Sequence, residues 1–523
     1  MATDLQIAVR KISSVNPATG EVLGEFECAS ESEVRAAVTC ARAAQSAWAE
    51  LGVRKRIGVL REFRRRLHER KSEIAEAITR EAGKPVAEAL TTEVLVVLDA
   101  ARFLIDNAYR LLRDEPVPHG NLATKLKCGW LAREPYGVVG IISPWNYPFS
   151  IPATETLAAL VAGNAVVLKP SELTSLVALE LQSMLQVAGV PRDVFRVVVG
   201  NGATGAALTH AQIDKLVFTG SIATGKRIAS AVAERLLPVV LELGGKDPML
   251  VLDDADVEVA SSAAVWGAFV NAGQTCLSVE RCYVHRSLYA EFLRACVGKA
   301  KKLRMGHGLD SETDVGPMIH EKQLRIVEEH VEDAVARGAR LLAGGFRLPE
   351  LGKNFYPPTV LADVTHEMRV MREETFGPVL PVMAFDNDDE AVQLANDSEY
   401  GLAASIWTRD NARGERLARR IQVGTVMVND VVSCFGISEA PHGGMKSSGI
   451  GRTHGRFGLE EMVRLKYVDV DRMPGMKKVW WYGYGMSFSR QMEGFLDMQF
   501  ACDFGTRLRG ALRAIGVVGR KQL

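Results

Sequence analysis

The spacing of apolar side chains predicts a largely helical first segment. After a hairpin-like start over residues 15–26, which contains Asn-Pro and Thr-Gly turn signals, apolar positions recur every three, four or seven residues. We expect one helix through Ile57, Leu60, Phe63, Leu67, Ile74 and Ile78, and a second over residues 95–112. Residues 114–135 break this pattern, and there we expect two short strands.

From residue 138 onward, short apolar runs alternate with helical segments. The runs predict strands over residues 138–142, 165–168, 194–199, 216–219 and 239–243. Between them the spacing predicts helices over residues 151–161, 173–188, 203–210 and 223–234. Strands that alternate with helices form a parallel sheet covered on both faces, and ligands bind beyond the carboxyl ends of its strands. A second α/β region follows, with helices expected over residues 288–301, 320–337 and 390–396 and strands over 380–385, 424–429 and 464–470.

Composition and charge exclude several classes of protein. The 523 residues are 47% apolar and 24% charged with zero net charge, which fits two or three globular domains and gives no reason to expect a nucleic-acid partner. The eight cysteines form no Cys-x-x-Cys pair, so we expect no metal site. Residues 1–6 show no secretory signal and no apolar run is long enough to span a bilayer, so we expect a reducing, cytoplasmic location.

Two peptides carry the residues most suited to catalysis. Cys276 follows Gly273-Gln274-Thr275, and Glu242 ends the apolar run of residues 239–241. A thiolate is a good nucleophile, and a carboxylate among apolar residues has a raised pKa that suits a general base. Singly, a cysteine is more often a small buried hydrophobic residue and such a glutamate an ordinary strand end. Together they describe a two-step acyl transfer.

Three loops lie at the predicted carboxyl ends of the strands. Asn146, between two prolines, offers an amide donor for an oxyanion, or else caps a turn. Lys169 and Glu172 could bind ribose hydroxyls, or else form a solvated strand end in which Ser171 caps the next helix. Gly220-Ser221 opens a helix whose free N–H groups could hold a pyrophosphate, or else is a plain strand-to-helix turn.

Two glycine-rich segments are weaker signals. Residues 200–205 match the dinucleotide pattern G-x-G-x-x-G, but no acidic residue ends the next strand, where the sequence is Phe218-Thr219-Gly220. We therefore expect Gly202 to form at most a wall of an adenosine pocket. Residues 440–451 lack the Walker spacing, and we expect them to pack near the active site.

The C-terminal extension, residues 472–523, differs in character from the rest of the chain. It contains nine Lys or Arg against three Asp or Glu, with an aromatic and basic run over residues 477–484. One interpretation is a peripheral membrane contact through interfacial aromatic residues. The other, which we favour here, is packing on the body or on a neighbouring subunit, so that deleting residues 472–523 should weaken assembly more than membrane binding.

Six motifs resemble those of the aldehyde dehydrogenase superfamily, in the family's order, over about residues 14–470. They are Pro-Trp-Asn-Tyr-Pro at 144–148, Lys-Pro-Ser-Glu at 169–172, Phe-Thr-Gly-Ser at 218–221, Leu-Glu-Leu-Gly-Gly-Lys at 241–246, Gly-Gln-Thr-Cys at 273–276 and Glu-Glu-Thr-Phe-Gly-Pro-Val at 373–379. The resemblance implies an α/β fold with two doubly wound open-sheet domains and a small β flap for oligomerisation. The implied NAD-binding domain comprises residues 1–115 and 136–244, the catalytic domain 245–462, and the flap 116–135 and 463–471, in a homodimer or homotetramer.

The resemblance also implies a site and a cofactor. Cys276 is then the nucleophile, Glu242 the general base and Asn146 the oxyanion donor. NAD is the implied cofactor, because Glu172 matches the position where a carboxylate repels the 2′-phosphate of NADP. The implied cofactor-binding residues are Ile142, Trp145, Lys169, Ser171, Glu172, Gly202, Phe218, Gly220, Ser221, Leu243, Glu374 and Phe376.

The implied reaction oxidises a small-molecule aldehyde to an acid through a Cys276 thiohemiacetal and a thioester, which water activated by Glu242 hydrolyses. We expect an aliphatic or aromatic aldehyde. The alternative is a semialdehyde, as in succinate-semialdehyde dehydrogenase, which would need an arginine in the substrate tunnel. The chain departs from many members in two places: Thr453-His454-Gly455 replaces a glutamate proposed as a proton relay, and His442 replaces a substrate-facing aromatic residue.

Overall fold

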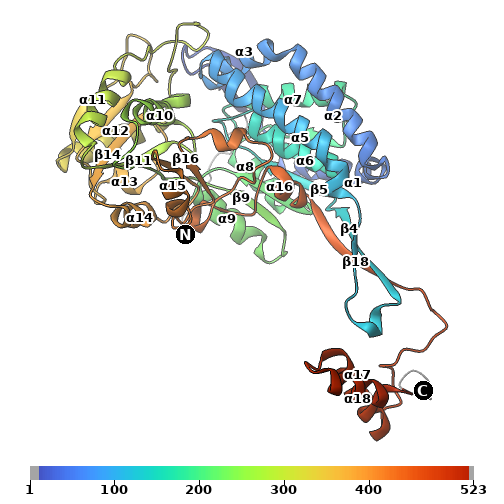
Figure 1. Cartoon of the computed structure of the whole chain (residues 1–523). Coiled ribbons are helices and arrows are strands. Elements are labelled where there is room, and N and C mark those ends of the chain that lie inside the picture. The colour runs from blue at the N-terminus through green and yellow to red at the C-terminus, as the bar shows by residue number, and fades with distance from the viewer. Residues whose placement is uncertain (1–10, 517–523) are drawn as a thin grey trace, which may run out of the picture. The chain divides into compact units, whose positions relative to one another are not determined.

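A computed structural model describes residues 11–516. Residues 1–6, in which we expect no secretory signal, lie outside the described residues, as does the end of the C-terminal extension with Arg520. The chain divides into two compact units. The first comprises residues up to 112 and 135–464, and the second comprises residues 113–134 and those from 465 on. Figure 1 labels their helices and strands.

The predicted parallel sheet is present in the first unit, and its strand order is β17-β9-β8-β5-β6-β7. β5 to β9 run parallel, and the short β17 pairs antiparallel with β9. The strands are β5 Val138–Ile142, β6 Ala165–Lys169, β7 Phe195–Val197, β8 Lys215–Thr219, β9 Val239–Glu242 and β17 Gly449–Ile450. The helices between them also confirm the prediction: α6 Ser150–Ala162, α7 Ser175–Val187, α8 Gly202–His210 and α9 Ile222–Ala233.

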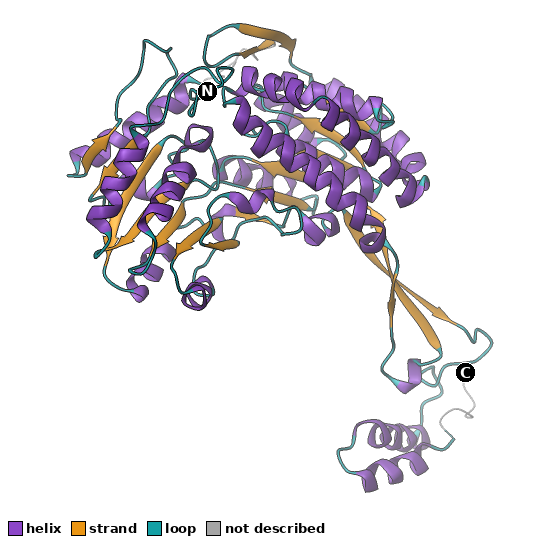
Figure 2. Ribbon diagram, turned by 45° about the horizontal axis from the view of Figure 1, so that its top comes forward, coloured by secondary structure: helices purple, strands orange, loops and turns teal. Residues whose placement is uncertain are grey.

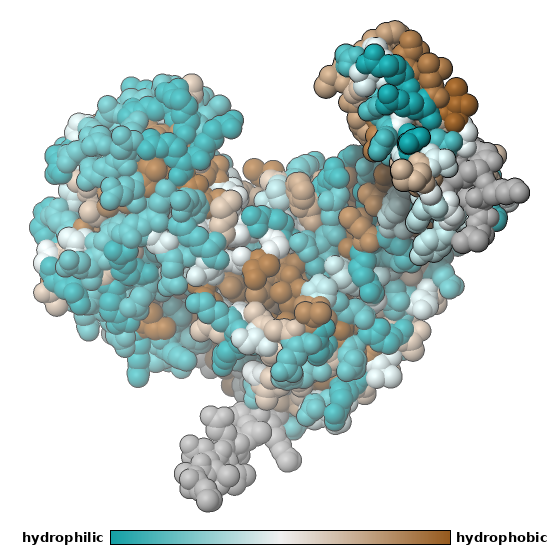
Figure 3. Space-filling view, turned by 90° about the horizontal axis from the view of Figure 1, so that it is seen from below, coloured by the Kyte–Doolittle hydropathy of each residue, from teal (hydrophilic) through white to brown (hydrophobic). Residues whose placement is uncertain are grey.

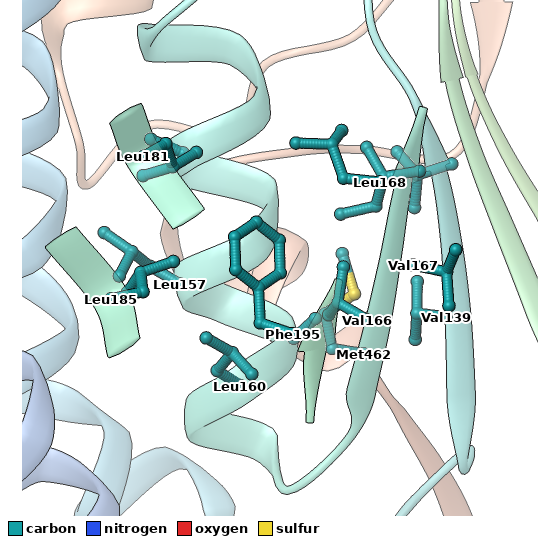
Figure 4. Packing of buried hydrophobic residues seen from close by; sticks show 14 of the residues in the cluster. Val139, Leu157, Leu160, Val166, Val167, Leu168, Leu181, Leu185, Phe195 and Met462 are labelled. Atoms are coloured by element: carbon teal, nitrogen blue, oxygen red, sulfur yellow. The ribbon is translucent and has the colours of Figure 1, made fainter. Parts of the chain in front are cut away.

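The core of this sheet explains why its strands read as continuous apolar runs. All five residues of β5 and all five of β6 are buried, because helices cover both faces (Figure 2). Figure 4 shows Phe195 of β7 among Leu157 and Leu160 of α6 and Leu181 and Leu185 of α7.

A second, seven-stranded sheet confirms the expected second α/β region, with strand order β12-β13-β14-β11-β10-β15-β16. Its strands are parallel except for the antiparallel edge pair β12–β13. They are β10 Asp247–Val251, β11 Val279–His285, β12 Arg340–Ala343, β13 Thr359–Ala362, β14 Val379–Phe385, β15 Ala403–Trp407 and β16 Thr425–Val428. The helices here are α10 Val257–Phe269, α11 Tyr289–Ala300, α12 Glu321–Ala336, α13 Arg369–Arg372, α14 Asp388–Asn396 and α15 Asn411–Ala418. Residues 243–246 join the two sheets, since β9 ends at Glu242 and β10 begins at Asp247.

The N-terminal helical layer corrects one prediction. The expected single helix from Ile57 to Ile78 is two helices, separated at Arg70, whose φ of −99° and ψ of 14° are not helical. The apolar spacing continues across this break, so periodicity alone did not reveal it. The layer begins with the hairpin β1 Lys11–Val15 and β2 Val22–Glu27 and continues through α1 Glu31–Glu50, α2 Gly52–Glu69, α3 Lys71–Ala82, α4 Val86–Glu88, the π-helix η1 Ala89–Val94 and α5 Leu95–Leu112.

The second unit contains a three-stranded antiparallel sheet and a helical hairpin. The sheet has the order β18-β4-β3, with β3 Glu115–Val117, β4 Lys127–Pro135 and β18 Val463–Asp471. The hairpin consists of α17 Met486–Phe500 and α18 Phe504–Ala514, which pack against each other. Within residues 11–516, no helix is long and apolar enough to cross a membrane. That same range contains no cluster of three or more metal-ligating side chains.

Candidate active site

One cavity collects most of the residues that the sequence singled out. It has a volume of about 270 Å³ and lies where the chain passes from β9 toward β10. The structure brings Cys276, Glu242 and Asn146 together on its wall, although they are far apart in sequence. Six of the predicted cofactor-binding residues line the same cavity: Trp145, Gly220, Ser221, Leu243, Glu374 and Phe376. A sulfur, a carboxylate and an amide can thus face one bound molecule.

Other predicted cofactor-binding residues lie along the carboxyl edge of the six-stranded sheet. Ile142 ends β5 and is paired in register with Lys169 of β6 and Phe218 of β8. Lys169 Nζ forms an ion pair with Glu172 at 3.3 Å, which places a carboxylate beside this edge. Gly202 opens α8, and a Cβ added there would meet no atom within 4 Å. This edge therefore offers polar groups and open space for the ribose end of a dinucleotide.

Helix capping at this edge differs from expectation at one position. Ser221 caps α9, and its Oγ accepts a hydrogen bond from the Thr224 N–H at 3.4 Å. The expectation that Ser171 caps the next helix is wrong, because α7 begins four residues later and Thr174 occupies the cap position. Ser171 Oγ instead accepts from the Leu173 N–H at 3.3 Å, so its hydroxyl stabilises the turn after β6.

The turn before Cys276 has an unusual backbone. Asn271, Ala272 and Gly273 have φ values of 54°, 54° and 71°, all in the left-handed region. A Cβ on Gly273 would collide with the carbonyl of Gly377, so this position requires glycine. Strained backbone of this kind persists at functional sites where the surroundings hold it. Here it carries the chain from the end of α10 to Cys276.

Hydrogen bonds join this turn to the loop that contains Asn146. The Asn146 side-chain amide donates to the Gln274 carbonyl at 3.0 Å. The Asn146 carbonyl accepts from Asn271 Nδ2 at 2.9 Å and from Lys84 Nζ at 2.7 Å. An asparagine amide has two N–H donors, so one remains for a ligand in the cavity. The predicted oxyanion donor is thus fixed relative to the predicted nucleophile.

A buried ion pair, Lys84–Glu93, fixes the loop that contains Asn146. Sequence reasoning missed this pair. Lys84 Nζ lies 2.7 Å from Glu93 Oε1, and both side chains are fully buried. Glu93 accepts from the N–H groups of Phe149 and Ser150 at 2.8 and 2.9 Å, and Lys84 lies 3.9 Å from the centre of the Tyr147 ring. Glu93 belongs to the π-helix η1, an irregularity found mostly at functional sites. The sequence signal for this pair was a glutamate directly before the apolar run of residues 94–98.

Replacing Lys84 with methionine should lower the free energy of unfolding by about 3 kcal/mol, because it leaves Glu93 as an uncompensated buried charge. Denaturant unfolding followed by fluorescence would measure this. Arg35→Met, which removes an exposed partner of Glu31, should leave stability nearly unchanged. A Lys84→Met protein as stable as this control would contradict the assignment of Lys84 as a charged, buried partner.

The electrostatics of the cavity keep the thiol protonated at rest. Burial raises the pKa of Cys276 well above its usual value, and the nearby Asp247, Glu374 and Glu242 raise it further. No Lys or Arg is among the described residues that line this cavity. The sulfur therefore needs a base to remove its proton before it can attack a carbonyl.

Glu242 has the environment expected of such a base. Burial raises the pKa of Glu242 well above its usual value and the nearby Glu155 adds to this, while Arg452 opposes it. Within residues 11–516, neither of its carboxylate oxygens has a hydrogen-bond partner. His442 Nε2 lies 3.9 Å from Glu242 Oε2, and burial lowers the pKa of His442 to about 3. A neutral imidazole thus lies beside the carboxylate without a formed hydrogen bond.

Thr453 and His454, where the chain departs from many family members, do not line this cavity. They border a separate small cavity of about 30 Å³ together with Glu155. Burial lowers the pKa of His454 to about 4 and raises that of Glu155 to about 8, so both groups favour their neutral forms.

Another buried carboxylate anchors the loop that contains Phe376. Glu280 accepts from the N–H groups of Thr375 and Phe376, both at 2.8 Å, and pairs with the buried Lys246. Phe376 has a φ of 51°, and its ring meets the Trp145 ring edge-on at 5.4 Å. Sequence reasoning missed Glu280, which lies inside the buried strand β11. Glu280 of β11 therefore fixes the loop that places Phe376 on the wall of the cavity.

Cys276 also lines a second cavity. It has a volume of about 260 Å³ and shares Cys276 and Ile151 with the first. Among the described residues that line it there is no Arg or Lys. Its other lining residues are Thr91, Thr92, Val96, Tyr147, Trp266, Thr275, Leu277, Val432, Ser433, Phe435 and Gly436. Apolar and aromatic side chains thus dominate this approach to Cys276.

Fold and site define an α/β enzyme with a thiol and a carboxylate between two open sheets. Comparison with known proteins agrees: the model of the aldehyde dehydrogenase family matches residues 6–468. The chain belongs to the aldehyde dehydrogenase family.

Relatives and solved structures support this assignment. The chain is 42% identical over 512 residues to the 4,4'-diapolycopene aldehyde oxidase of Methylomonas sp, covering 96% of this chain and 94% of the relative. It is 40% identical to a putative succinate-semialdehyde dehydrogenase [NADP(+)] of Mycolicibacterium smegmatis, covering 87% and 88%. The NAD+ complex of an aldehyde dehydrogenase from Bacillus cereus has a TM-score of 0.84 at 36% identity, covering 88% of this chain and 93% of that one. The predicted aldehyde dehydrogenase-like α/β fold is confirmed.

Proposed function

We propose that this enzyme oxidises apolar aldehydes to carboxylic acids with NAD as the hydride acceptor. One observation carries the proposal: Cys276 borders two cavities, one with Glu242, Asn146 and Glu374, the other largely apolar. The first has the groups for hydride transfer and hydrolysis, and the second suits a hydrocarbon chain.

The residues around the first cavity fit a dinucleotide. The N-terminus of α9, capped by Ser221, presents N–H groups suited to a pyrophosphate. Trp145, Glu374 and Phe376 would border the nicotinamide end, and Lys169 and Glu172 the ribose. When bound, NAD accepts a hydride from the carbon attached to sulfur.

The protein's own groups would act in a fixed order. Glu242 takes the thiol proton, directly or through water, and the Cys276 thiolate attacks the aldehyde carbonyl. The resulting oxyanion is held by the free N–H of the Asn146 amide and by the Cys276 backbone N–H. After oxidation leaves a thioester on Cys276 and Glu242 has released the thiol proton to solvent, Glu242 removes a proton from water. The hydroxide so formed adds to the thioester carbonyl, which displaces the sulfur as a thiolate and releases the acid.

The apolar second cavity favours a hydrocarbon aldehyde over a semialdehyde. A carboxylate-bearing substrate needs a cation, and none is among the described residues that line this cavity. The relative from Methylomonas sp is named as a 4,4'-diapolycopene aldehyde oxidase and not as a semialdehyde dehydrogenase, which supports the same choice. The relatives named as succinate-semialdehyde dehydrogenases keep the alternative open.

A panel of aldehydes, followed by NADH absorbance, tests the proposal. We expect kcat/KM for decanal and for an aromatic aldehyde to exceed that for succinate semialdehyde by about a hundredfold, because a buried unpaired carboxylate is strongly disfavoured. A clear preference for the semialdehyde would favour the alternative, and no NADH with any aldehyde would refute the proposed activity.

Glu172 should set the choice between NAD and NADP. Glu172→Gln is expected to reduce the preference for NAD by about tenfold, because it removes the charge that repels a 2′-phosphate. The ratio of kcat/KM for the two cofactors measures this. Glu234→Gln, at an exposed site at the end of α9, is the matched control and should leave the ratio unchanged. An unchanged ratio in Glu172→Gln would place the discrimination elsewhere.

A further inference from the structure

The helices α17 and α18 of the hairpin contact each other at two glycines, and several of their large apolar side chains stay exposed. The two helices cross at Gly494 and Gly510, both buried. A Cβ on Gly494 would lie 2.8 Å from the Gly510 carbonyl oxygen, and one on Gly510 would lie 2.6 Å from that of Gly494. The two backbones are therefore in direct contact, and the large side chains are left for another partner.

Those side chains form an apolar face on the hairpin. Phe504, Leu508, Leu512 and Ile515 are 79%, 55%, 63% and 71% exposed. Their spacing of four, eight and eleven residues from Phe504 places them on one side of α18 and its end. Met486, Leu496 and Phe500 on α17 are also exposed, and Figure 3 shows apolar surface on the C-terminal hairpin.

The surroundings of this face are basic and aromatic. Residues 472–523 contain nine Lys or Arg against three Asp or Glu. Just before the hairpin lie Trp480, Trp481, Tyr482 and Tyr484, all at least 40% exposed. Tryptophan and tyrosine favour the boundary between lipid and water, and basic residues are attracted to anionic headgroups. An apolar helix face with these neighbours is typical of a helix that lies in a membrane surface.

We propose that the hairpin of residues 486–515 docks this enzyme on the surface of a bilayer that contains anionic lipid. The apolar face enters the headgroup region, and neither helix crosses the membrane. The match to the Methylomonas relative covers 96% of this chain, so it includes part of the C-terminal extension after residue 471. The match to the Mycolicibacterium relative covers 87% of this chain. If the proposed function holds, docking brings the enzyme to aldehydes that partition into lipid. The structure therefore favours docking on a membrane over the packing on protein that the sequence alone favours.

Vesicle flotation of the full chain, without aldehyde or cofactor, tests the docking. We expect binding to phosphatidylcholine vesicles that contain phosphatidylglycerol, and at least about tenfold less bound protein with Leu508→Glu/Leu512→Glu, because two carboxylates would enter the bilayer interface. The matched control is Thr506→Glu, which adds the same group to α18 off the apolar face, near the capping Asp503. It should bind as the unaltered chain does. Raised salt, or pure phosphatidylcholine, should weaken binding of all forms.

Several results would overturn the proposal. They are no vesicle binding by the unaltered chain, equal binding by the double variant, or a drop in sedimenting mass of the double variant in the absence of vesicles. The last would identify the face as a contact between subunits. Unchanged oxidation of a short, water-soluble aldehyde by both variants would show that they are folded. Because flotation needs no turnover, failure of the proposed activity would leave its result intact.

Discussion

Replacing Cys276 with alanine is expected to reduce NADH formation from an aldehyde by about 10⁴-fold or more. The sulfur supplies the covalent bond without which neither hydride transfer from a tetrahedral carbon nor thioester hydrolysis proceeds, and removing such a nucleophile has effects of this size. Because Cys276 borders two cavities and is only partly buried against a small apolar cluster, thermal stability should change little. NADH absorbance and a melting curve on the same preparation measure the two quantities.

The matched control is Cys434→Ala, which removes a buried thiol from the same small apolar cluster. Its activity should stay within a few-fold of the unaltered enzyme, because Cys434 does not line the cavity with Glu242. Equal rates for Cys276→Ala and the unaltered protein would exclude Cys276 as the nucleophile. Mass spectrometry after a pulse of aldehyde and NAD should find an acyl adduct only on Cys276.

Glu242→Gln is expected to slow steady-state turnover by about 10²- to 10³-fold and to slow the first burst of NADH as well, because a glutamine can take neither the proton of the thiol nor that of the hydrolytic water. Rapid mixing would separate burst and steady state. In the unaltered enzyme the rate should fall as pH drops through the raised pKa of Glu242, because protonation removes the base. This acid limb should be absent in Glu242→Gln.

Glu155→Gln provides the control for removal of a buried carboxyl group near the site. Glu155 raises the pKa of Glu242 but lines the neighbouring cavity, so this variant should retain turnover and shift the acid limb to lower pH. An acid limb that survives in Glu242→Gln would identify a different base. A burst as fast as in the unaltered enzyme would restrict Glu242 to hydrolysis and would mean that another group takes the thiol proton.

The stability of the folded chain should also depend on pH through the Glu242 carboxyl group, and it should fall as pH rises. The folded-state pKa of Glu242 is raised, so the folded chain binds this proton more tightly than the unfolded chain. Glu242 therefore contributes least to stability when pH rises above its folded pKa, where its charge is buried. Glu242→Gln has no such charge, and its melting temperature should exceed that of the unaltered protein most at alkaline pH.

The sequence by itself determined the features that depend on short stretches of chain. The apolar runs over residues 138–142 and 165–168 predicted buried strands, because a strand covered on both faces carries little else. The peptides around Glu242 and Cys276 predicted the base and nucleophile that we propose, because carboxylate and thiol chemistry needs those residue types beside small or apolar neighbours. These inferences need only residues adjacent in sequence.

The tertiary structure alone decided what depends on contacts between distant residues. Only folding puts Cys276, Glu242 and Asn146 on one cavity wall, and only folding brings Val96, Trp266 and Val432 into an apolar approach to the sulfur. The buried pairs Lys84–Glu93 and Lys246–Glu280 were missed because each charge reads as solvated until its partner is known. Periodicity records which face of an element is apolar, whereas the residue that meets that face is fixed by packing across the whole chain.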